Sequence, residues 1–190
     1  MTPLAGRRPR VSLRGSPEGQ VQWAVGSMTV ALRPLHRGDE EAAVRWSADP
    51  EFCRAADWTP GLAARVVRRH WQSLIAARDP TFRRFGLTLD GRLVGYADLA
   101  DLTAQSGELG IAVGERALWG QGIAAQGCRA LLAWAWSQEL QEVTAQVHEP
   151  NARSHALLAR LGFQAVGWGP PEPYQGEVVP VRHYRLVRPS

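Results

Sequence analysis

The residues from Glu108 to Gly122 join a short apolar run to a glycine-rich loop. The run contains the β-branched Ile111 and Val113, which favour a buried strand. The loop carries Gly120 and Gly122, and a helix with apolar periodicity follows it. This order suits a bound anion such as a phosphate, because the first N–H groups of a helix have no intrahelical partner and carry partial positive charge.

Two common phosphate-binding motifs do not describe this loop. A Walker loop needs a lysine after its last glycine, and this chain contains no lysine. A dinucleotide fingerprint, Gly-x-Gly-x-x-Gly, is approximated by Gly120, Gly122 and Ala125. That fingerprint normally follows the first strand of its domain, whereas this loop lies past the middle of the chain. The loop itself therefore predicts anion binding without naming the ligand.

The composition is that of an ordinary globular protein. A chain of 190 residues suits one domain with a sizeable core, and 45% hydrophobic residues can fill it. No apolar run is long enough for a membrane-spanning helix. The two cysteines, Cys53 and Cys128, lack the spacing of metal ligands. We therefore expect reduced packing thiols in a cytoplasmic protein.

The net charge of +4 lies mostly at the N-terminal end. Residues 1–27 hold four arginines against one acidic residue, and residues 28–190 hold 18 arginines against 17 acidic residues. We expect 1–27 to be a disordered basic tail and 28–190 to form a single domain. The nearly neutral domain argues against a nucleic-acid-binding face, although binding through the tail stays open as a third reading.

Periodicity predicts the elements that position the loop. Strands are expected at residues 29–35, 82–89, 93–99, 106–113, 143–148, 163–167 and 181–187. Helices are expected at about 39–49, 62–77, 122–140 and 152–161. Asp90-Gly91 is the strongest hairpin signal, and 52–60 and 169–176 are expected to be loops.

This element order resembles that of the GNAT acetyltransferases. The segment from Trp119 to Ala124 is similar to their motif A, (Gln/Arg)-x-x-Gly-x-(Gly/Ala), with Trp119 in the first place. This version resembles the Rim-type branch of ribosomal-protein N-terminal acetyltransferases. Asn151-x-x-Ser154, followed by Leu-Leu and Leu-Gly-Phe, also has the family's spacing. Over about residues 28–188 the resemblance implies an α/β (α+β) GNAT fold: a mixed, mostly antiparallel sheet with a splayed central strand pair and about four helices.

The resemblance implies acetyl-CoA as cosubstrate and no metal. The cosubstrate would lie where the strands of residues 108–113 and 143–148 splay apart, with its pyrophosphate on the glycine loop. This placement is physically reasonable, because an extended arm with amide groups can pair with an open strand edge and phosphates can bind at a helix start. The alternative is that the glycines only form a tight turn. The implied cofactor-binding residues are Ile111, Ala112, Val113, Trp119, Gly120, Gln121, Gly122, Ile123, Ala124, Asn151 and Ser154.

Two residues are candidates for catalysis of acetyl transfer to an amine. The attacking nitrogen must lose a proton, and the resemblance places Glu108 near the thioester to receive it. Ser154 is the candidate to hydrogen-bond the sulfur and protonate the departing thiolate, which needs modest help at a thiol pKa of about 8.5. Each has a structural alternative: an ion pair for Glu108, a local bond for Ser154, and helix capping for Asn151.

Trp58 and Tyr174, with Arg54, are the candidate walls of the acceptor pocket, although Trp58 also fits a core position. The Rim-type branch often shows Tyr-x-Gly-x-x-x-Asp here, and Pro180 stands where the acid would be. The acceptor therefore stays open between a protein N-terminus and a small amine such as a polyamine or an aminoglycoside. A non-catalytic acetyl-CoA sensor is the alternative function. No membrane or nucleic-acid partner is expected, and a homodimer is left open.

Overall fold

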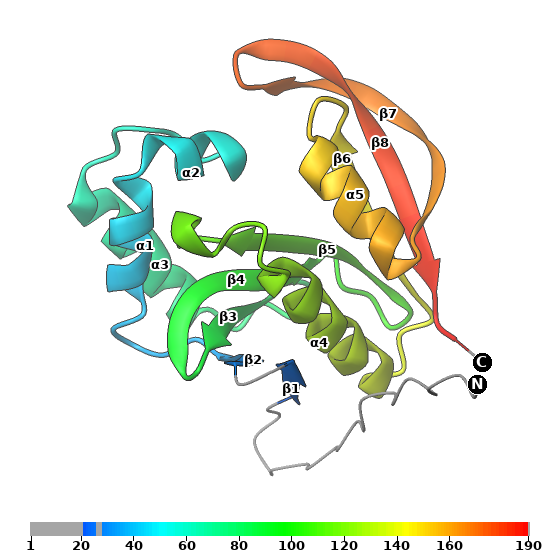
Figure 1. Ribbon diagram of the computed structural model, residues 1–190, viewed down its shortest axis with the longest axis horizontal. Helices are drawn as coiled ribbons and strands as arrows, with labels where there is room; N and C mark the ends of the chain where they lie inside the picture. The colour runs from blue at the N-terminus through cyan, green and yellow to red at the C-terminus, as the bar shows by residue number, and fades with distance from the viewer. Residues whose placement is uncertain (1–20, 26–27, 190) are drawn as a thin grey trace, which may run out of the picture.

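The computed structural model describes residues 21–25 and 28–189. Within them an eight-stranded sheet has the order β1-β2-β3-β4-β5-β6-β8-β7 (Figure 1). Only β5 and β6 pair in parallel, so this described sheet is mixed and mostly antiparallel, as predicted. The strands are β1 Val21–Val25, β2 Met28–Pro34, β3 Arg83–Leu89, β4 Arg92–Ala100, β5 Ser106–Val113, β6 Glu142–His148, β7 Gln164–Tyr174 and β8 Glu177–Val187.

The helices cover both faces of the sheet. They are α1 Glu40–Ser47, α2 Pro50–Ala55, α3 Ala64–Ala76, α4 Ile123–Ser137 and α5 Ala152–Leu161, with a 3-10 turn, η1, at Arg116–Leu118. Neighbouring β5 residues belong to different cores: Leu109 and Ile111 pack with α4, whereas Ala112 packs with α1–α3. Since successive strand residues point to opposite faces, α4 and α1–α3 lie on opposite sides of β5.

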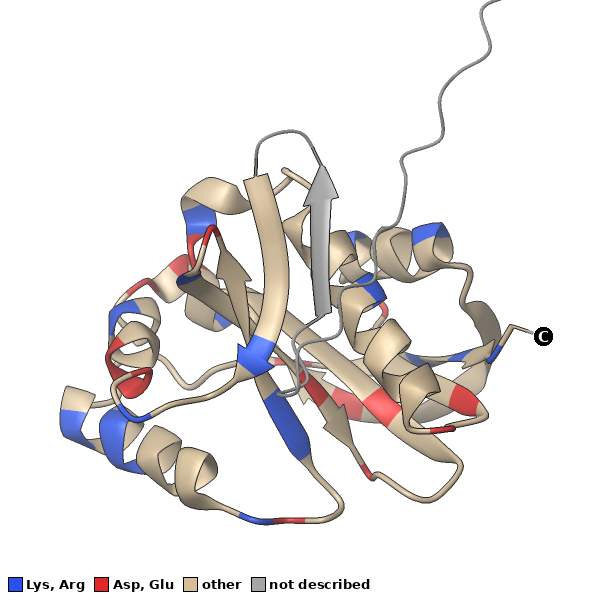
Figure 2. Cartoon of the chain, turned by 90° about the horizontal axis from the view of Figure 1, so that it is seen from below, with Lys and Arg blue, Asp and Glu red and all other residues tan. Residues whose placement is uncertain are grey.

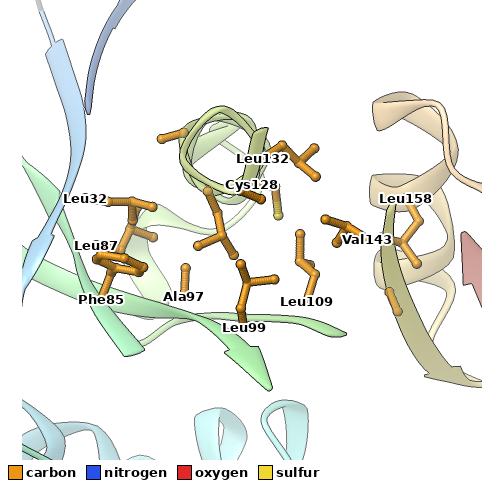
Figure 3. Packing of buried hydrophobic residues seen from close by; sticks show 14 of the residues in the cluster. Leu32, Phe85, Leu87, Ala97, Leu99, Leu109, Cys128, Leu132, Val143 and Leu158 are labelled. Atoms are coloured by element: carbon orange, nitrogen blue, oxygen red, sulfur yellow. The ribbon is translucent and has the colours of Figure 1, made fainter. Parts of the chain in front are cut away.

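The larger core lies between the sheet and α4. Leu87, Leu99 and Leu131 are completely buried in it, and each such side chain contributes about 1.5–3 kcal/mol on burial. Figure 3 shows the strand side chains directed toward α4, with Leu158 of α5 beside Val143 of β6. This core holds α4 against β5, so the start of α4 has a defined place at the sheet.

Two expectations about loops are wrong. Residues 52–60 are not wholly loop, because α2 begins at Pro50: Asp49 Oδ1 accepts a 3.0 Å bond from Glu51 N, and proline suits the first helical position. With α2, the described residues hold five α-helices, close to the expected four. Residues 169–176 are mostly strand, since the prolines there lie on the edge strand β7, where the ladder skips from Gly169 to Glu172.

The expected basic tail includes one described strand. Residues 21–25 form β1 and pair with β2, so the expectation of disorder is wrong for these five residues. The rest of the predicted tail, residues 1–20 and 26–27, lies outside the described residues. The boundary at residue 28 stays a prediction.

Charged residues of both signs are spread over the described elements, and the view in Figure 2 shows them interspersed. On α3, Arg65 and Arg69 are exposed, and Arg68 donates to the Glu41 carboxylate through two guanidinium nitrogens. This agrees with the near balance of charge in residues 28–190. None of the helices in the described part of the chain has the length and apolar character to cross a bilayer.

Candidate active site

The strands β5 and β6 separate after three paired positions. Ser106, Gly107 and Glu108 pair with β6, and the ladder ends there. β5 stays paired with β4 as far as Val113, and β6 stays paired with β8 as far as His148. The second half of each strand therefore borders a gap between them. The predicted splay of the central strand pair is confirmed.

The glycine loop leads from the wide end of this gap into α4. Gly120 and Gly122 have φ of +78° and +79°, and a Cβ at either would meet nothing within 4 Å. Glycine is thus favoured by the left-handed backbone conformation, which costs other residues about 1–2 kcal/mol, and not by crowding. The loop lets the chain reverse from β5 into α4 with an open surface outside it.

The start of α4 fits an anion. Gly122 is its N-cap and has no side chain to accept a hydrogen bond. The first helical bond runs from Gln126 N to Gly122 O at 3.1 Å. The N–H groups of Ile123, Ala124 and Ala125 consequently have no acceptor among the described residues. Such groups are satisfied by a ligand or by water, and a phosphate is the ligand they suit.

Trp119 connects the glycine loop to both β5 and α5. Its Nε1 donates to Val113 O at 2.7 Å, which uses a carbonyl at the end of β5. The guanidinium of Arg153, on the first turn of α5, lies 5.1 Å from the Trp119 ring centroid. Sequence reasoning missed Arg153, because a cation–π contact between α5 and the loop leaves no local signal. The contact adds a positive charge beside the glycine loop.

Asn151 caps α5, as its structural alternative predicted. Its Oδ1 accepts from Ser154 N at 3.1 Å, and its own N–H donates to His148 O at 2.9 Å. The half-buried Ser154 makes no side-chain hydrogen bond with a described residue, so the alternative of a local hydroxyl bond is not seen. The hydroxyl thus remains available to a ligand.

Glu108 bridges the two strands where they part. Its Oε2 accepts a 2.8 Å bond from Gln146 Nε2 across the beginning of the gap. Glu108 is half-buried, and in the alternation of β5 it shares a face with Ala112, which packs on the α1–α3 side. The expected ion pair is replaced by this hydrogen bond.

The candidate acceptor walls have different surroundings. Trp58 packs on Phe52 with ring centroids 5.0 Å apart and donates from Nε1 to Tyr96 Oη at 3.0 Å. It therefore belongs to a second hydrophobic core, which lies between α1–α3 and the face of the sheet opposite α4. Tyr174 is buried and stacks on His148. The tip of the β7–β8 hairpin reaches α2, where Gln175 Nε2 donates to Arg54 O at 3.2 Å (Figure 1).

The two cysteines are buried and free, which confirms them as packing thiols. Burial raises the pKa of the Cys128 thiol to about 12 and also raises that of Cys53. A thiol that is buried and protonated near neutral pH is a poor nucleophile.

His148 is a polar residue of the site that sequence reasoning did not single out. Its Nε2 is buried without a hydrogen-bond partner among the described residues, 3.7 Å from Glu172 Oε2. The only available signal was its place in the alternation of β6, where it shares a face with Gln146.

Comparison with known proteins agrees with this geometry. Residues 29–164 match the family model described as an acetyltransferase (GNAT) domain. A segment of 73 residues is 33% identical to an uncharacterized protein of Methanocaldococcus jannaschii. That segment covers 38% of this chain and only 15% of the length of that relative.

Solved structures share the fold. RimJ of Mycobacterium smegmatis, in complex with CoA-disulfide, is 25% identical with a TM-score of 0.74, over 84% of this chain and 82% of that one. Spermidine N-acetyltransferase of Vibrio cholerae, in complex with CoA and spermine, is 21% identical with a TM-score of 0.71, over 83% and 95%. A Salmonella typhimurium acetyltransferase that modifies the N-terminal serine of ribosomal protein L7/L12 is 17% identical with a TM-score of 0.73, over 84% and 95%.

The family model covers most of the chain, and the splayed strands, glycine loop and capped α5 lie within the residues it matches. The chain therefore belongs to the GNAT acetyltransferase family, with RimJ- and RimL-type enzymes among its structural neighbours.

Proposed function

We propose that this acetyltransferase takes the acetyl group of acetyl-CoA and transfers it to a primary amine by direct attack, without an acyl-enzyme. The observation that carries the proposal is the meeting of two features at the gap: the free edge of β5 and the uncapped start of α4. An extended amide chain can add to the former, and phosphates can accept hydrogen bonds from the latter. Direct attack needs no nucleophilic side chain, which is consistent with two buried cysteines.

The residues present fit the cosubstrate at both ends. Ile111, Ala112 and Val113 would hold the pantetheine arm through backbone groups along the gap. The loop from Trp119 to Ala124 would hold the pyrophosphate, with Arg153 adding charge and Asn151 available from the start of α5. When bound, acetyl-CoA supplies an acyl carbon activated as a thioester.

Glu108 and Ser154 would act on opposite sides of the reacting carbon. The Glu108 carboxylate would attract the acceptor ammonium and is the first candidate to receive its proton. The Ser154 hydroxyl would donate a hydrogen bond to the sulfur as the C–S bond breaks. Both are half-buried, so partial exclusion of water strengthens these interactions.

The acceptor would enter on the face of β5 and β6 opposite α4, between α2 and the β7–β8 hairpin. The Gln175–Arg54 contact joins these two elements, and Tyr174 lies just before it. Trp58 would support this wall from the second core. Neighbours with this fold acetylate a protein N-terminus or a polyamine, and both are primary amines that this site would admit.

Ligand and activity assays test the proposal in two steps. Acetyl-CoA and CoA should raise the melting temperature, whereas ATP and NAD should leave it unchanged. Thiol release from acetyl-CoA should then depend on an added amine, with a peptide that begins with serine and spermidine as the first two acceptors. The proposed function would be contradicted if acetyl-CoA did not raise the melting temperature, or if no amine of a broad panel increased the rate of thiol release.

A further inference from the structure

His148 ends β6 beside the wide part of the gap, and its two ring nitrogens differ. Nε2 is buried and has no hydrogen-bond partner among the described residues. The Glu172 carboxylate lies 3.7 Å from it, beyond ordinary hydrogen-bond length. Nδ1 makes no hydrogen bond with a described residue and is not among the buried unpartnered atoms, and the side chain is 22% exposed. One nitrogen thus faces a carboxylate, and the other remains open.

The ring is held in place by stacking. Its centroid lies 4.4 Å from that of Tyr174, with 15° between the planes. His155 provides a contrast, since Nδ1 bonds to Tyr184 Oη at 2.6 Å and Nε2 to Glu149 O at 3.2 Å. A buried polar atom without a partner is uncommon in folded proteins, and a catalytic role is one explanation for it. His155 therefore has the contacts of a structural histidine, and His148 does not.

The position of His148 connects the two halves of the site. It follows Gln146 on the same face of β6, about 7 Å further along, and Gln146 binds the Glu108 carboxylate. Its carbonyl accepts from the N–H of Asn151, the residue that caps α5 next to Ser154. The imidazole thus lies on the same face of the sheet as Gln146 and Glu108. In sequence, His148 comes just before Asn151 and Ser154, which are assigned to the cosubstrate.

We propose that His148, oriented by Glu172, is the group that takes the proton from the acceptor amine. The inference rests on the proposed function and refines it: Glu108 attracts the ammonium, and His148 deprotonates it. An imidazole suits this transfer better than a carboxylate, because its ordinary pKa lies nearer to neutral pH. Glu172 acts as a positioning residue: its carboxylate, 3.7 Å from Nε2, electrostatically favours a hydrogen on that nitrogen, so that Nδ1 presents a lone pair.

The ammonium gives one proton to His148 Nδ1, and the neutral nitrogen attacks the thioester carbon. The C–N bond forms and the C–S bond breaks, with its electron pair leaving on sulfur. The second proton of the nitrogen passes to the thiolate, with Ser154 as the hydrogen-bonding group. The imidazolium then releases its proton to water, so the products are an amide, CoA and one proton.

The groups that face His148 define what else can influence a pH profile. Glu172 and Tyr174 face it from β7. His183 on β8 lies opposite Gln146 and so shares this face, and Glu108 on β5 lies beyond Gln146.

The test combines kinetics with a binding measurement. His148→Gln should lower kcat/KM at pH 7 about 100-fold and abolish the rise of the rate with pH near neutrality, while CoA affinity by calorimetry stays within twofold. Glu172→Gln should lower kcat while CoA affinity stays within twofold, because the tautomer that presents Nδ1 is no longer favoured. His70→Gln, an exposed change on α3, should alter none of these. Thermal melts of all variants report whether they fold.

A second readout does not depend on turnover. The imidazole ¹⁵N signals of His148, identified by their loss in His148→Gln, should shift when spermidine or the serine peptide is added to the CoA-bound protein, whereas those of His70 should not. Amine-dependent thiol release that is equal in His148→Gln and in the unaltered protein would overturn this inference and leave the proposed function standing. Unchanged His148 signals with both amines would also overturn it. Failure to bind acetyl-CoA would instead overturn the proposed function.

Discussion

The Glu108 carboxylate accepts a 2.8 Å hydrogen bond from the Gln146 amide at the point where β5 and β6 stop pairing. The bond closes the narrow end of the gap, because Glu108 is the last β5 residue in the ladder with β6. The same carboxylate faces the side of the sheet opposite α4. Its oxygens can therefore hold the two strands together and still offer negative charge to an acceptor.

Glu108→Gln separates these two roles, since the amide keeps the shape and can still bond to Gln146. We expect CoA affinity to stay within twofold, and KM for the amine to rise about tenfold, which corresponds to about 1.4 kcal/mol of lost attraction. Steady-state kinetics from pH 6 to 9 provide the measurement. If the rise of kcat with pH disappears in Glu108→Gln and survives in His148→Gln, Glu108 is the proton acceptor.

Gly120→Glu should remove CoA binding, because it places a carboxylate beside the free N–H groups of α4 and forces a side chain into the left-handed region. Gly61→Glu is a matched control: its φ is +74°, and no atom lies within 4 Å of its added Cβ. Both changes should cost similar backbone strain, but only Gly120→Glu should weaken CoA at least tenfold by calorimetry. Equal affinities in the two variants would show that the loop does not hold the phosphates.

Arg153→Gln tests the charge next to Trp119. We expect CoA affinity to fall about threefold to tenfold at low ionic strength and the difference to shrink in high salt, since an exposed charge is screened. Arg160→Gln, also exposed and at the other end of α5, is the control and should leave affinity unchanged. A loss for Arg153→Gln that does not vary with salt would point to packing on Trp119 instead of attraction to phosphate.

The features that the sequence predicted are those encoded locally. The glycine loop, the helix start (expected at residue 122 and found at Ile123) and the bounds of α5 at Ala152–Leu161 follow from residues that are neighbours in the chain. The splay could be predicted only through family resemblance, because strand pairing depends on segments far apart in sequence.

The features that were missed depend on a distant segment folding back. His148 meets Glu172 and Tyr174 because the edge strand β7 continues through a proline-rich stretch that reads as a loop. Strand alternation placed His148 on the face of Gln146, but no local pattern could show what would pack against it. Arg153 likewise gains its place only from the angle at which α5 meets the loop.

Burial of Cys128 should make the protein less stable as the pH becomes alkaline. Burial raises the pKa of its thiol to about 12, whereas an unfolded thiol titrates near 8.5. Because the folded pKa is the higher one, the contribution of the protonated thiol is complete below about pH 8.5 and is lost as the pH rises toward the folded value. From pH 8.5 to 10.5, the free energy of unfolding of the unaltered protein should therefore fall more steeply than that of Cys128→Ala, by up to about 1.4 kcal/mol per pH unit. Urea unfolding of the two proteins measures the difference, and parallel curves would show that this thiol ionises equally well in the folded chain.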